Sequence, residues 1–385
     1  MTLSQSNQVP VNTTELPTRS WQKWLLLAFL VYVMLTAVGM IGSGFKVATG
    51  EHAKTLFSFA SNPILGLIIG MVATALIQSS STVTSIIVGM VAGGLPVSIA
   101  VPMMMGANIG TSITNTLVSL GHVTNKEEFQ RAFNAATIHD FFNVLSVLIF
   151  LPIEIAFGVL EHLSAFVVSI LHTGEAMGVS GFNPIKFVTQ PVISQLTTLF
   201  SFLPEMYLGL MKILIGIGLI VTSITFMGKI MKSLMVGKAK ELLHKSIGKG
   251  PVSGITSGAI MTVLVQSSST TTSLVVPLVG TGILKVKDIY PFTLGANVGT
   301  CITALIAALG ISGENSAFAL QIALVHLLYN ILAVLVIYGI RFLRFLPLTL
   351  SYQLSLKVAE RKVYGFGYIA GLFFVVPLSI IFVTM

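Results

Sequence analysis

Two short polar runs stand out in a chain that is otherwise strongly apolar. Gln78-Ser79-Ser80-Ser81-Thr82 recurs 188 residues later as Gln266-Ser267-Ser268-Ser269-Thr270. Each run offers an amide and several hydroxyls, which can donate hydrogen bonds to the oxygens of an anion or coordinate a hard cation. A helix that begins at either run would add free backbone N–H groups and the positive end of its dipole. This chemistry predicts a binding site for an oxyanion.

The segments that carry these runs contain no charged side chain to neutralise an anion. Residues 55–121 include no Asp, Glu, Lys, Arg or His, and neither do residues 251–284. An anion held away from water without a fixed positive group is costly unless cations bind beside it. Neutral oxygens of Gln, Ser, Thr, Asn and main-chain carbonyls form the kind of shell in which transporters hold Na⁺. We therefore expect Na⁺ to bind together with the anion.

Two further motifs recur at nearly the same separation. Gly106–Thr111 (Gly-Ala-Asn-Ile-Gly-Thr) returns as Gly295–Thr300, and His139–Asn143, which begins with His and ends with Asn, returns as His326–Asn330. The doubled Asn and Thr favour a ligand role over helix packing alone. The His and Asn share a helix face, and structural hydrogen bonding is favoured over proton transfer. Three motifs in one order at nearly one offset indicate a duplicated unit.

One acidic residue has no counterpart in the duplication. Asp140 follows the first histidine, whereas Leu327 stands at the equivalent position of the second unit. An ionisable group next to a membrane span is a functional candidate by default. Asp140 is therefore a further candidate, although a position near the end of the span would give it an ordinary structural function.

The elements that position these motifs must be membrane helices. Of the 385 residues, 54% are apolar and only 9% are charged, whereas a soluble domain carries roughly 25% charged residues. This excludes soluble globules, disordered chains and coiled coils. The 21 Lys and Arg against 13 Asp and Glu are typical of the cytoplasmic loops of a membrane protein rather than of nucleic-acid binding. We expect an all-α polytopic membrane protein surrounded by lipid.

Apolar stretches of about 20 residues cross a bilayer as helices. The segments with the polar motifs are instead broken by Gly, Pro, Ser, Thr and Asn, and broken backbone at membrane depth needs protein or water to satisfy its polar groups. We expect re-entrant hairpins and discontinuous helices there. Ordinary spans are predicted at Trp24–Ile41, Ala135–Leu151, Ile155–Leu171, Met206–Phe226, Ala317–Ile340 and Phe366–Thr384.

Loop charges predict that the two units are inverted. Arg19 and Lys23 flank the first span, and six lysines follow Phe226, so both segments are expected in the cytoplasm. Residues 173–204 carry a single lysine and are expected outside. The opening span of the first unit then runs outward and that of the second runs inward. The basic loop 341–362 fits the cytoplasm by charge and the opposite side by strict inversion, so its side stays open.

The predicted organisation follows from these boundaries. A cytoplasmic polar tail covers residues 1–20, a first transmembrane repeat 21–172 and an outer linker 173–205. A second transmembrane repeat covers 206–340, and a C-terminal loop with a terminal membrane helix covers 341–385. Inverted repeats with interrupted segments are the architecture of secondary transporters, whose substrate site lies at the midplane between the halves. The oligomeric state stays open.

The sequence resembles the type II sodium-dependent phosphate cotransporters. The doubled Gln-Ser-Ser-Ser runs, the two Gly-Ala-Asn segments and the stretch Arg131–Pro152 carry the resemblance, which covers about residues 30–340. It implies symport of inorganic phosphate with Na⁺ by alternating access, on inverted repeats whose serine runs meet in the middle. The short linker without cysteine resembles a compact bacterial relative, which implies the inner membrane, with no cofactor besides co-transported Na⁺.

The resemblance also implies a set of ligands from the two serine runs and the segments that follow them. The phosphate ligands would be Gln78, Ser79, Ser80, Ser81, Gln266, Ser267, Ser268, Ser269, Asn108 and Asn297. The Na⁺ ligands would be Gln78, Ser79, Gln266, Ser267, Ala296, Thr300 and Thr303, with Thr111 and Thr114 as counterparts in the first repeat.

Alternatives to phosphate symport remain. Another oxyanion, such as sulfate or arsenate, would suit the same site. An intramembrane serine hydrolase could be built from a serine of either run and His139 or His326, with the two groups in hydrogen-bond contact. The duplication argues against an enzyme, because an enzyme needs no second nucleophile run. A regulatory scaffold is disfavoured, because the chain has no sizeable soluble domain.

Overall fold

A computed structural model describes residues 20–50, 62–173, 184–246, 249–311 and 315–384, and this part of the chain contains helices and no strand. Within it, seven helices are long and apolar enough to cross a membrane. The prediction of an all-α polytopic membrane protein is therefore confirmed. Most of the predicted polar tail, and part of the linker between the halves, lie outside the described residues. The seven spans are Trp21–Thr49, Val97–His122, Lys126–Phe157, Glu205–Leu234, Val286–Leu309, Ser316–Tyr338 and Val363–Phe382.

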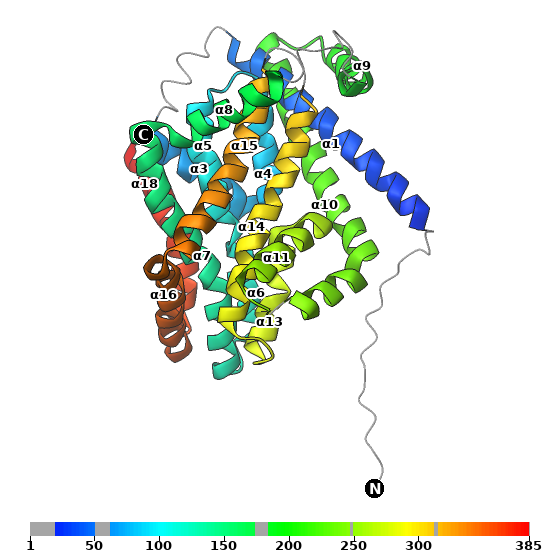
Figure 1. Cartoon of the computed structure of the whole chain (residues 1–385). Coiled ribbons are helices and arrows are strands. Elements are labelled where there is room, and N and C mark those ends of the chain that lie inside the picture. Colours follow the sequence, from blue (N-terminus) through cyan, green and yellow to red (C-terminus); the bar gives the residue numbers. More distant parts are fainter. Residues whose placement is uncertain (1–19, 51–61, 174–183, 247–248, 312–314, 385) are drawn as a thin grey trace.

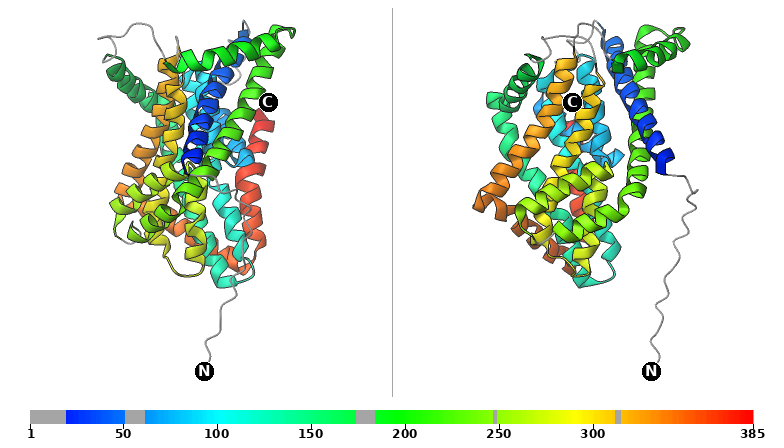
Figure 2. Two further views of the ribbon diagram at one scale, coloured as in Figure 1. Left: turned by 90° about the vertical axis from the view of Figure 1, so that its right-hand side faces the viewer. Right: turned by 45° about the vertical axis from the view of Figure 1, so that its right-hand side comes forward.

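Two long helices, α1 (Ser20–Thr49) and α10 (Glu205–Ser246), lie side by side and run in opposite directions (Figure 1; Figure 2). Small residues permit this close approach, since a Cβ added at Gly44 would come within 2.7 Å of the carbonyl oxygen of Gly209. A further helix, α9 (Pro184–Leu199), packs against α1. Each long helix precedes a segment that carries one of the serine runs.

The serine runs join short helices that cannot cross a bilayer singly. α3 (Pro63–Ile77) and α4 (Ser80–Ala92) lie in the upper half of Figure 1, whereas α11 (Pro251–Val265), α12 (Ser268–Ser273) and α13 (Val275–Gly280) lie in the lower half. α3 and α11 have 15 residues each, and about 20 are needed for a span. This arrangement fits the expected hairpins, one at each end of the molecule.

Each hairpin packs on the helix that follows it. α3 lies against α5 (Val97–Thr111), which continues as α6 (Ile113–Ser119) and η2 (Leu120–His122), and α11 lies against α14 (Val286–Leu309). Both contacts are made through glycine, because a Cβ at Gly106 would clash with the carbonyl oxygen of Leu67, and one at Gly295 would clash with that of Ile255. The first Gly of each repeated Gly-Ala-Asn segment thus brings two backbones together.

Two further long helices each carry an amphipathic extension. α7 (Lys126–Phe157) leads into α8 (Val159–Thr173), and α15 (Ser316–Ala333) leads through η4 (Val334–Tyr338) into α16 (Arg341–Glu360). α8 packs against α15, whereas α16 packs against α7. In Figure 1, α8 lies across the upper end of the molecule and α16 lies at the lower end. The chain ends with α17 (Val363–Ala370), η5 (Gly371–Val375) and α18 (Val376–Thr384).

The span predicted over Ile155–Leu171 does not form. α7 ends at Phe157, and Gly158 adopts the left-handed conformation (φ 58°, ψ 34°) that commonly ends a helix. The carboxylate of Glu154 then accepts the backbone N–H groups of Leu160 (2.6 Å) and Glu161 (3.0 Å), which caps the next helix. α8 has 15 residues, fewer than a span requires.

The core lies where the two halves of the chain meet. Met104 and Ile138 from the first half and Leu294 and Val325 from the second are fully buried in one hydrophobic cluster. Large apolar side chains also cover the outside, with Phe382 the most exposed at 85%. In water such a surface would be unfavourable, so the outer apolar faces fit contact with lipid.

Candidate functional site

Both serine runs begin with the same unusual turn. Gln78 ends α3 at φ 56° and ψ 28°, and Gln266 ends α11 at φ 56° and ψ 27°. They are the two non-glycine residues with positive φ in the described part of the chain. A left-handed conformation costs such a residue about 1–2 kcal/mol. Glycine would avoid this strain, so the two glutamines are candidates for a function of their side-chain amides.

The serines that follow start new helices. Ser79 Oγ accepts the backbone N–H of Thr82 (3.3 Å), and Ser267 Oγ accepts that of Thr270 (3.2 Å), so each is a helix N-cap. α4 and α12 therefore present the remaining N–H groups of their first turns toward the interruption. These are the groups and the positive dipole ends that favour an anion.

Several hydroxyls of the runs have no partner within the described protein. Ser80, Ser81 and Ser268 are 3–4% exposed, and their side-chain oxygens form no hydrogen bond with the described residues. Ser269 Oγ makes a long 3.5 Å contact to the carbonyl oxygen of Thr111. Ser80, Ser81 and Ser268 thus keep hydroxyl donors and acceptors available for a ligand.

Only some of the predicted Na⁺ ligands lie in hydrogen-bond contact with a serine run in the described structure. Thr303 Oγ1 lies 3.4 Å from Gln266 Oε1, and the amide nitrogen of Gln266 donates to the carbonyl oxygen of Val263 (2.7 Å). Thr300 and Thr111 donate to carbonyl oxygens one turn earlier in their own helices, those of Ala296 (3.0 Å) and Ala107 (2.9 Å). The Thr114 hydroxyl is buried without a partner. Gln266 and Thr303 are thus brought together.

The two runs face opposite halves of the molecule. α4 packs against α14 and α15 of the second half, and α12 packs against α6 of the first. Among the described residues, no hydrogen bond joins a residue of one run directly to a residue of the other. Each run therefore lies at the junction of the halves, and the expected meeting of the two runs stays a prediction.

Asn108, a predicted phosphate ligand, is held by the second half. Its amide nitrogen donates to Asn330 Oδ1 (2.9 Å), and its Oδ1 lies 3.0 Å from His326 Nε2. The Asn330 amide nitrogen in turn donates to the carbonyl oxygen of His326 (2.9 Å) and lies 3.4 Å from the sulfur of Cys301. All these side chains are at most 3% exposed.

Asn297 is held in the same way by the first half. Its amide nitrogen donates to Asn143 Oδ1 (2.7 Å), and its Oδ1 lies 2.6 Å from His139 Nε2. Asn143 donates to the backbone carbonyl oxygen of Asn108 (2.8 Å). The His–Asn motifs therefore form the structural hydrogen bonds that the sequence favours. Asn108 and Asn297 already have protein partners on both sides of their amides, and a ligand function for them stays a prediction.

Asp140 lies in a buried pocket of hydroxyl groups. Its Oδ2 accepts hydrogen bonds from Thr116 (3.2 Å) and Tyr368 (2.9 Å), while its Oδ1 is buried without a partner. No basic side chain bonds to it among the described residues. Such a carboxylate can be held as the neutral acid or beside a cation. Sequence reasoning misses Thr116 and Tyr368, since no motif marks either residue and Tyr368 is 228 positions away.

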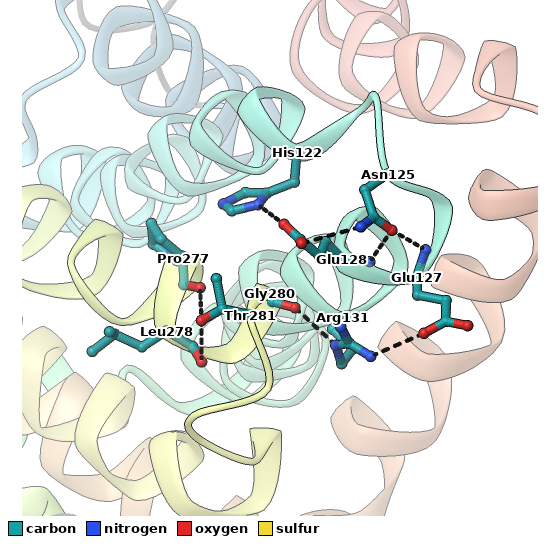
Figure 3. Close-up of polar contacts among 9 residues, drawn as sticks. All are labelled: His122, Asn125, Glu127, Glu128, Arg131, Pro277, Leu278, Gly280 and Thr281. Atoms are coloured by element: carbon teal, nitrogen blue, oxygen red, sulfur yellow. Dashed lines mark hydrogen bonds and ion pairs between the residues drawn. The ribbon is translucent and has the colours of Figure 1, made fainter. Parts of the chain in front are cut away.

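The end of the second hairpin is fastened to α7 at the lower end of the molecule. Figure 3 shows Arg131 of α7 donating through Nε to the carbonyl oxygen of Gly280 (2.8 Å) and pairing with Glu127 (3.6 Å). Beside it, His122 Nδ1 lies 3.1 Å from the carboxylate of Glu128. Gly280 permits this contact, because a Cβ there would come within 3.2 Å of Ala132.

The upper end has an equivalent but weaker fastening. Asn315, at the start of α15, donates to the carbonyl oxygen of Ala92 (3.0 Å), which stands 188 residues before Gly280. A cavity of about 310 Å³ opens beside this contact, with Glu161, Gln321 and the turn at Gly94 in its wall. The two ends therefore differ, with a charged network at the lower end and a neutral contact beside an open cavity at the upper.

Comparisons with known proteins identify the family. The Na⁺/Pi-cotransporter family matches residues 33–168 and 219–369. The chain is 33% identical over 430 residues to sodium-dependent phosphate transport protein 2A of Rattus norvegicus, covering 94% of this chain and 67% of the relative. It is 33% identical over 446 residues to sodium-dependent phosphate transport protein 2B of Homo sapiens, covering 92% and 64%.

The match is therefore extensive, although the chain spans only about two thirds of the length of these relatives. No solved structure matches the chain. The family match takes in both serine runs, both Gly-Ala-Asn segments and both His–Asn motifs. From this match over most of its length, the chain belongs to the Na⁺/Pi-cotransporter family.

Proposed function

We propose that this protein is a secondary active symporter that couples Na⁺ influx to the uptake of inorganic phosphate. The observation that carries the proposal is the doubled helix start at Ser80 and Ser268, where unbonded hydroxyls stand in segments without any charged residue. Its relatives are named as sodium-dependent phosphate transport proteins. Integral membrane placement follows from the seven apolar helices and the family. Because this is a family of transporters, the hydrolase alternative is set aside.

The proposed phosphate ligands are the serine runs. Ser80, Ser81 and Ser268 offer free hydroxyls, and the first turns of α4 and α12 offer N–H groups to the phosphate oxygens. Gln78 and Gln266 add side-chain amides from their left-handed turns. Asn108 and Asn297 bind partners in the opposite half, so we assign them to holding the halves together rather than to direct phosphate contact.

Sodium coupling follows from charge. Phosphate brings one or two negative charges into a site without basic side chains, and Na⁺ bound nearby would offset that cost. Gln266 and Thr303 form the proposed centre of one Na⁺ site. Ser267 follows Gln266 in the chain, and Ala296 and Thr300 lie in the same helix as Thr303. Gln78, Ser79, Thr111 and Thr114 are the counterparts in the first half, and the buried Thr114 hydroxyl without a partner supports their inclusion.

We propose alternating access because the two hairpins occupy corresponding positions at opposite ends of the molecule, but only the lower hairpin is held by a charged side chain among the described residues. The hairpin at the lower end is fastened by Arg131, and the hairpin at the upper end lies beside a cavity. If the lower hairpin were released while the upper hairpin became fastened, the midplane would be exposed to each side of the membrane in turn. The midplane location of the site and the exchange between ends are parts of the proposal.

The test is uptake of radiolabelled phosphate into proteoliposomes containing the purified protein. We expect uptake to require an inward Na⁺ gradient and to fall to the level of empty liposomes when choline replaces Na⁺. Uptake that is indifferent to Na⁺ would reject the coupling. Competition by unlabelled sulfate and arsenate in the same assay decides between phosphate and another oxyanion, since the preferred anion abolishes uptake at the lowest concentration.

A further inference from the structure

The central His–Asn contacts are alike in the two halves at histidine Nε2, which faces the asparagine of the opposite half. They differ at the amide nitrogens of Asn143 and Asn330, and at the second imidazole nitrogen. His139 Nδ1 has a partner, the amide nitrogen of Asn115 at 3.3 Å. His326 Nδ1 is buried and has no partner. Both imidazoles are fully buried, so the extra partner of His139 is a structural difference between the two halves.

The direction of the hydrogen bonds in the first set follows from a backbone carbonyl. Asn143 must donate to the carbonyl oxygen of Asn108, which can only accept. Asn143 Oδ1 therefore accepts from the amide nitrogen of Asn297. Asn297 Oδ1 then faces His139, whose Nε2 must carry the proton. His139 Nδ1 is left as an acceptor, and Asn115 donates to it through its amide nitrogen.

The chain of hydrogen bonds continues from Asn115 to the second serine run. Because the Asn115 amide nitrogen donates to His139, its Oδ1 is turned toward α12 and accepts from Thr272 Oγ1 (2.8 Å). Thr272 lies one helical turn after Ser268, and its single hydroxyl proton is shared between Asn115 Oδ1 and the carbonyl oxygen of that serine, which lies 2.8 Å away. Asn115 and Thr272 are each 1% exposed. A buried connection thus runs from His139 to the helix that carries Ser268.

The first serine run has no such connection. Ala304 stands in the second half where Asn115 stands in the first, 189 residues earlier, so no amide reaches His326 Nδ1. Thr84, the counterpart of Thr272, bonds only to the carbonyl oxygen of Ser81 in its own helix (3.2 Å). The hydroxyl of Thr272 therefore reaches Asn115 in the other half of the chain, whereas that of Thr84 makes no bond outside α4 in the described structure.

We propose that Asn115 is a positioning residue that, through Thr272, fixes the second serine run against the central His–Asn set. Asn115 touches neither phosphate nor Na⁺ in this proposal, and acts by holding the first turn of α12 in its binding orientation. The inference rests on the proposed symport function, whose substrates are bound by that turn. The first serine run has no equivalent among the described residues.

The experiment compares matched hydroxyl deletions in the two halves. Thr272→Val removes the bond to Asn115, and Thr84→Val removes the equivalent hydroxyl, which bonds only within its own helix. We expect Thr272→Val to raise the half-saturating concentrations of phosphate and Na⁺ about fivefold to tenfold, the effect of losing one buried hydrogen bond at the site. Thr84→Val should change either by less than about twofold. Thr272→Ser keeps the hydroxyl and should restore wild-type values.

Asn115→Ala removes the other partner of the same bond. Alanine is chosen because the second half has alanine at the equivalent position, 304. It should raise the same two concentrations, and combining it with Thr272→Val should add little, because both remove one interaction. Monodispersity and thermal stability in detergent identify folded variants. If Thr272→Val does not fold, Asn115→Ala and the Thr272→Ser rescue decide the matter.

Two results would overturn the inference while leaving the proposed function intact. One is equal effects of Thr272→Val and Thr84→Val on phosphate affinity in a protein whose wild type shows Na⁺-driven uptake. The other is fully additive effects of Asn115→Ala and Thr272→Val. Absence of Na⁺-driven phosphate uptake in the wild type would instead reject the function itself.

Discussion

Ser80 and Ser268 occupy the same position, the first residue of a helix, in opposite halves of the molecule. Both hydroxyls are unbonded in the described structure, although each residue is only 3% exposed. If phosphate and Na⁺ share one site, each bound ligand strengthens binding of the other by the same factor, because linkage is reciprocal. A change that weakens phosphate binding then also lowers the affinity for Na⁺ measured with phosphate present.

Ser80→Ala and Ser268→Ala are therefore each expected to raise the dissociation constants of phosphate and Na⁺ together, by about fivefold to tenfold for one hydrogen bond to a charged group. Isothermal titration of purified protein with each ligand, at fixed concentrations of the other, measures both. Ser85→Ala is the control, because that buried hydroxyl bonds to the carbonyl oxygen of Ser81 (2.8 Å). A change confined to one ligand would show that the sites are separate.

Sequence identifies polar residues that repeat, and among those that do not it singles out Asp140 by its charge alone. The serine runs, Asn108 and the His–Asn motifs are visible because they occur twice at one offset. Asn115 and Thr116 belong to a single copy and look like ordinary polar residues of a membrane helix. Their importance comes from what the fold sets opposite them, Thr272 in one case and Asp140 in the other. No local pattern carries that information.

At the scale of the helices, the packing of each hairpin on its neighbouring helix depends on a glycine. Gly106 and Gly295 each lie against a backbone carbonyl, so that an added methyl group must push two helices apart. Overpacking of this kind typically costs about 1–3 kcal/mol. Because the same helices carry the serine runs and the central asparagines, the displacement would also reach the binding site.

Gly106→Ala and Gly295→Ala should each lower the thermal unfolding temperature in detergent and weaken phosphate binding. Gly218→Ala in α10 provides the control, since nothing lies within 4 Å of a Cβ at that position, and alanine should be neutral or slightly stabilising in a helix. Unfolding followed by tryptophan or dye fluorescence gives the measurement. Equal behaviour of Gly106→Ala and Gly218→Ala would contradict close helix contact at Gly106.

The length of apolar stretches predicted five of the seven spans in the described residues and failed at one junction. It missed Val97–His122 and Val286–Leu309, where broken helices were expected, and the second of these is one continuous helix. Residues 155–171 are apolar enough for a span, yet the left-handed turn at Gly158 and the capping carboxylate of Glu154 divide them. Hydrophobicity averaged over about 20 residues does not register a single turn residue. The two helix-breaking features were present in the sequence, but their effect depends on backbone conformation.

At the scale of the whole molecule, the basic residues gather at one end. α16, with Arg341, Arg344 and Lys357, lies at the lower end together with the later part of α10, which carries Lys229 and Lys232 (Figure 1; Figure 2). The sequence leaves the side of residues 341–362 open, because it treats them as a loop. α16 is a helix that corresponds to α8 but lies at the opposite end of the molecule, as inverted units require. Its basic residues lie at the same end as those of α10, so the charge pattern and the inversion agree. The positive-inside rule predicts that the lower end is cytoplasmic.

Single cysteines can test this orientation, because the native Cys301 is fully buried. Ser201, between α9 and α10, and Gln353, in α16, are both exposed. A membrane-impermeant maleimide should label Ser201→Cys in intact cells and label Gln353→Cys only after permeabilisation. The reverse pattern would show that the lower end faces outward. Labelling of both positions in intact cells would place α16 and the α9–α10 connection on the same side of the membrane.

The reciprocal bonding of Asn108 and Asn297 has a consequence for descent. Each amide finds its imidazole and carboxamide partners in the opposite half, so an ancestral half-length polypeptide would have buried an unsatisfied asparagine in the lipid-embedded interior. Such an ancestor could meet that need by associating with a copy of itself inserted upside down. The later fusion of two genes would then have preserved a homodimer's interface as the interior of one polypeptide.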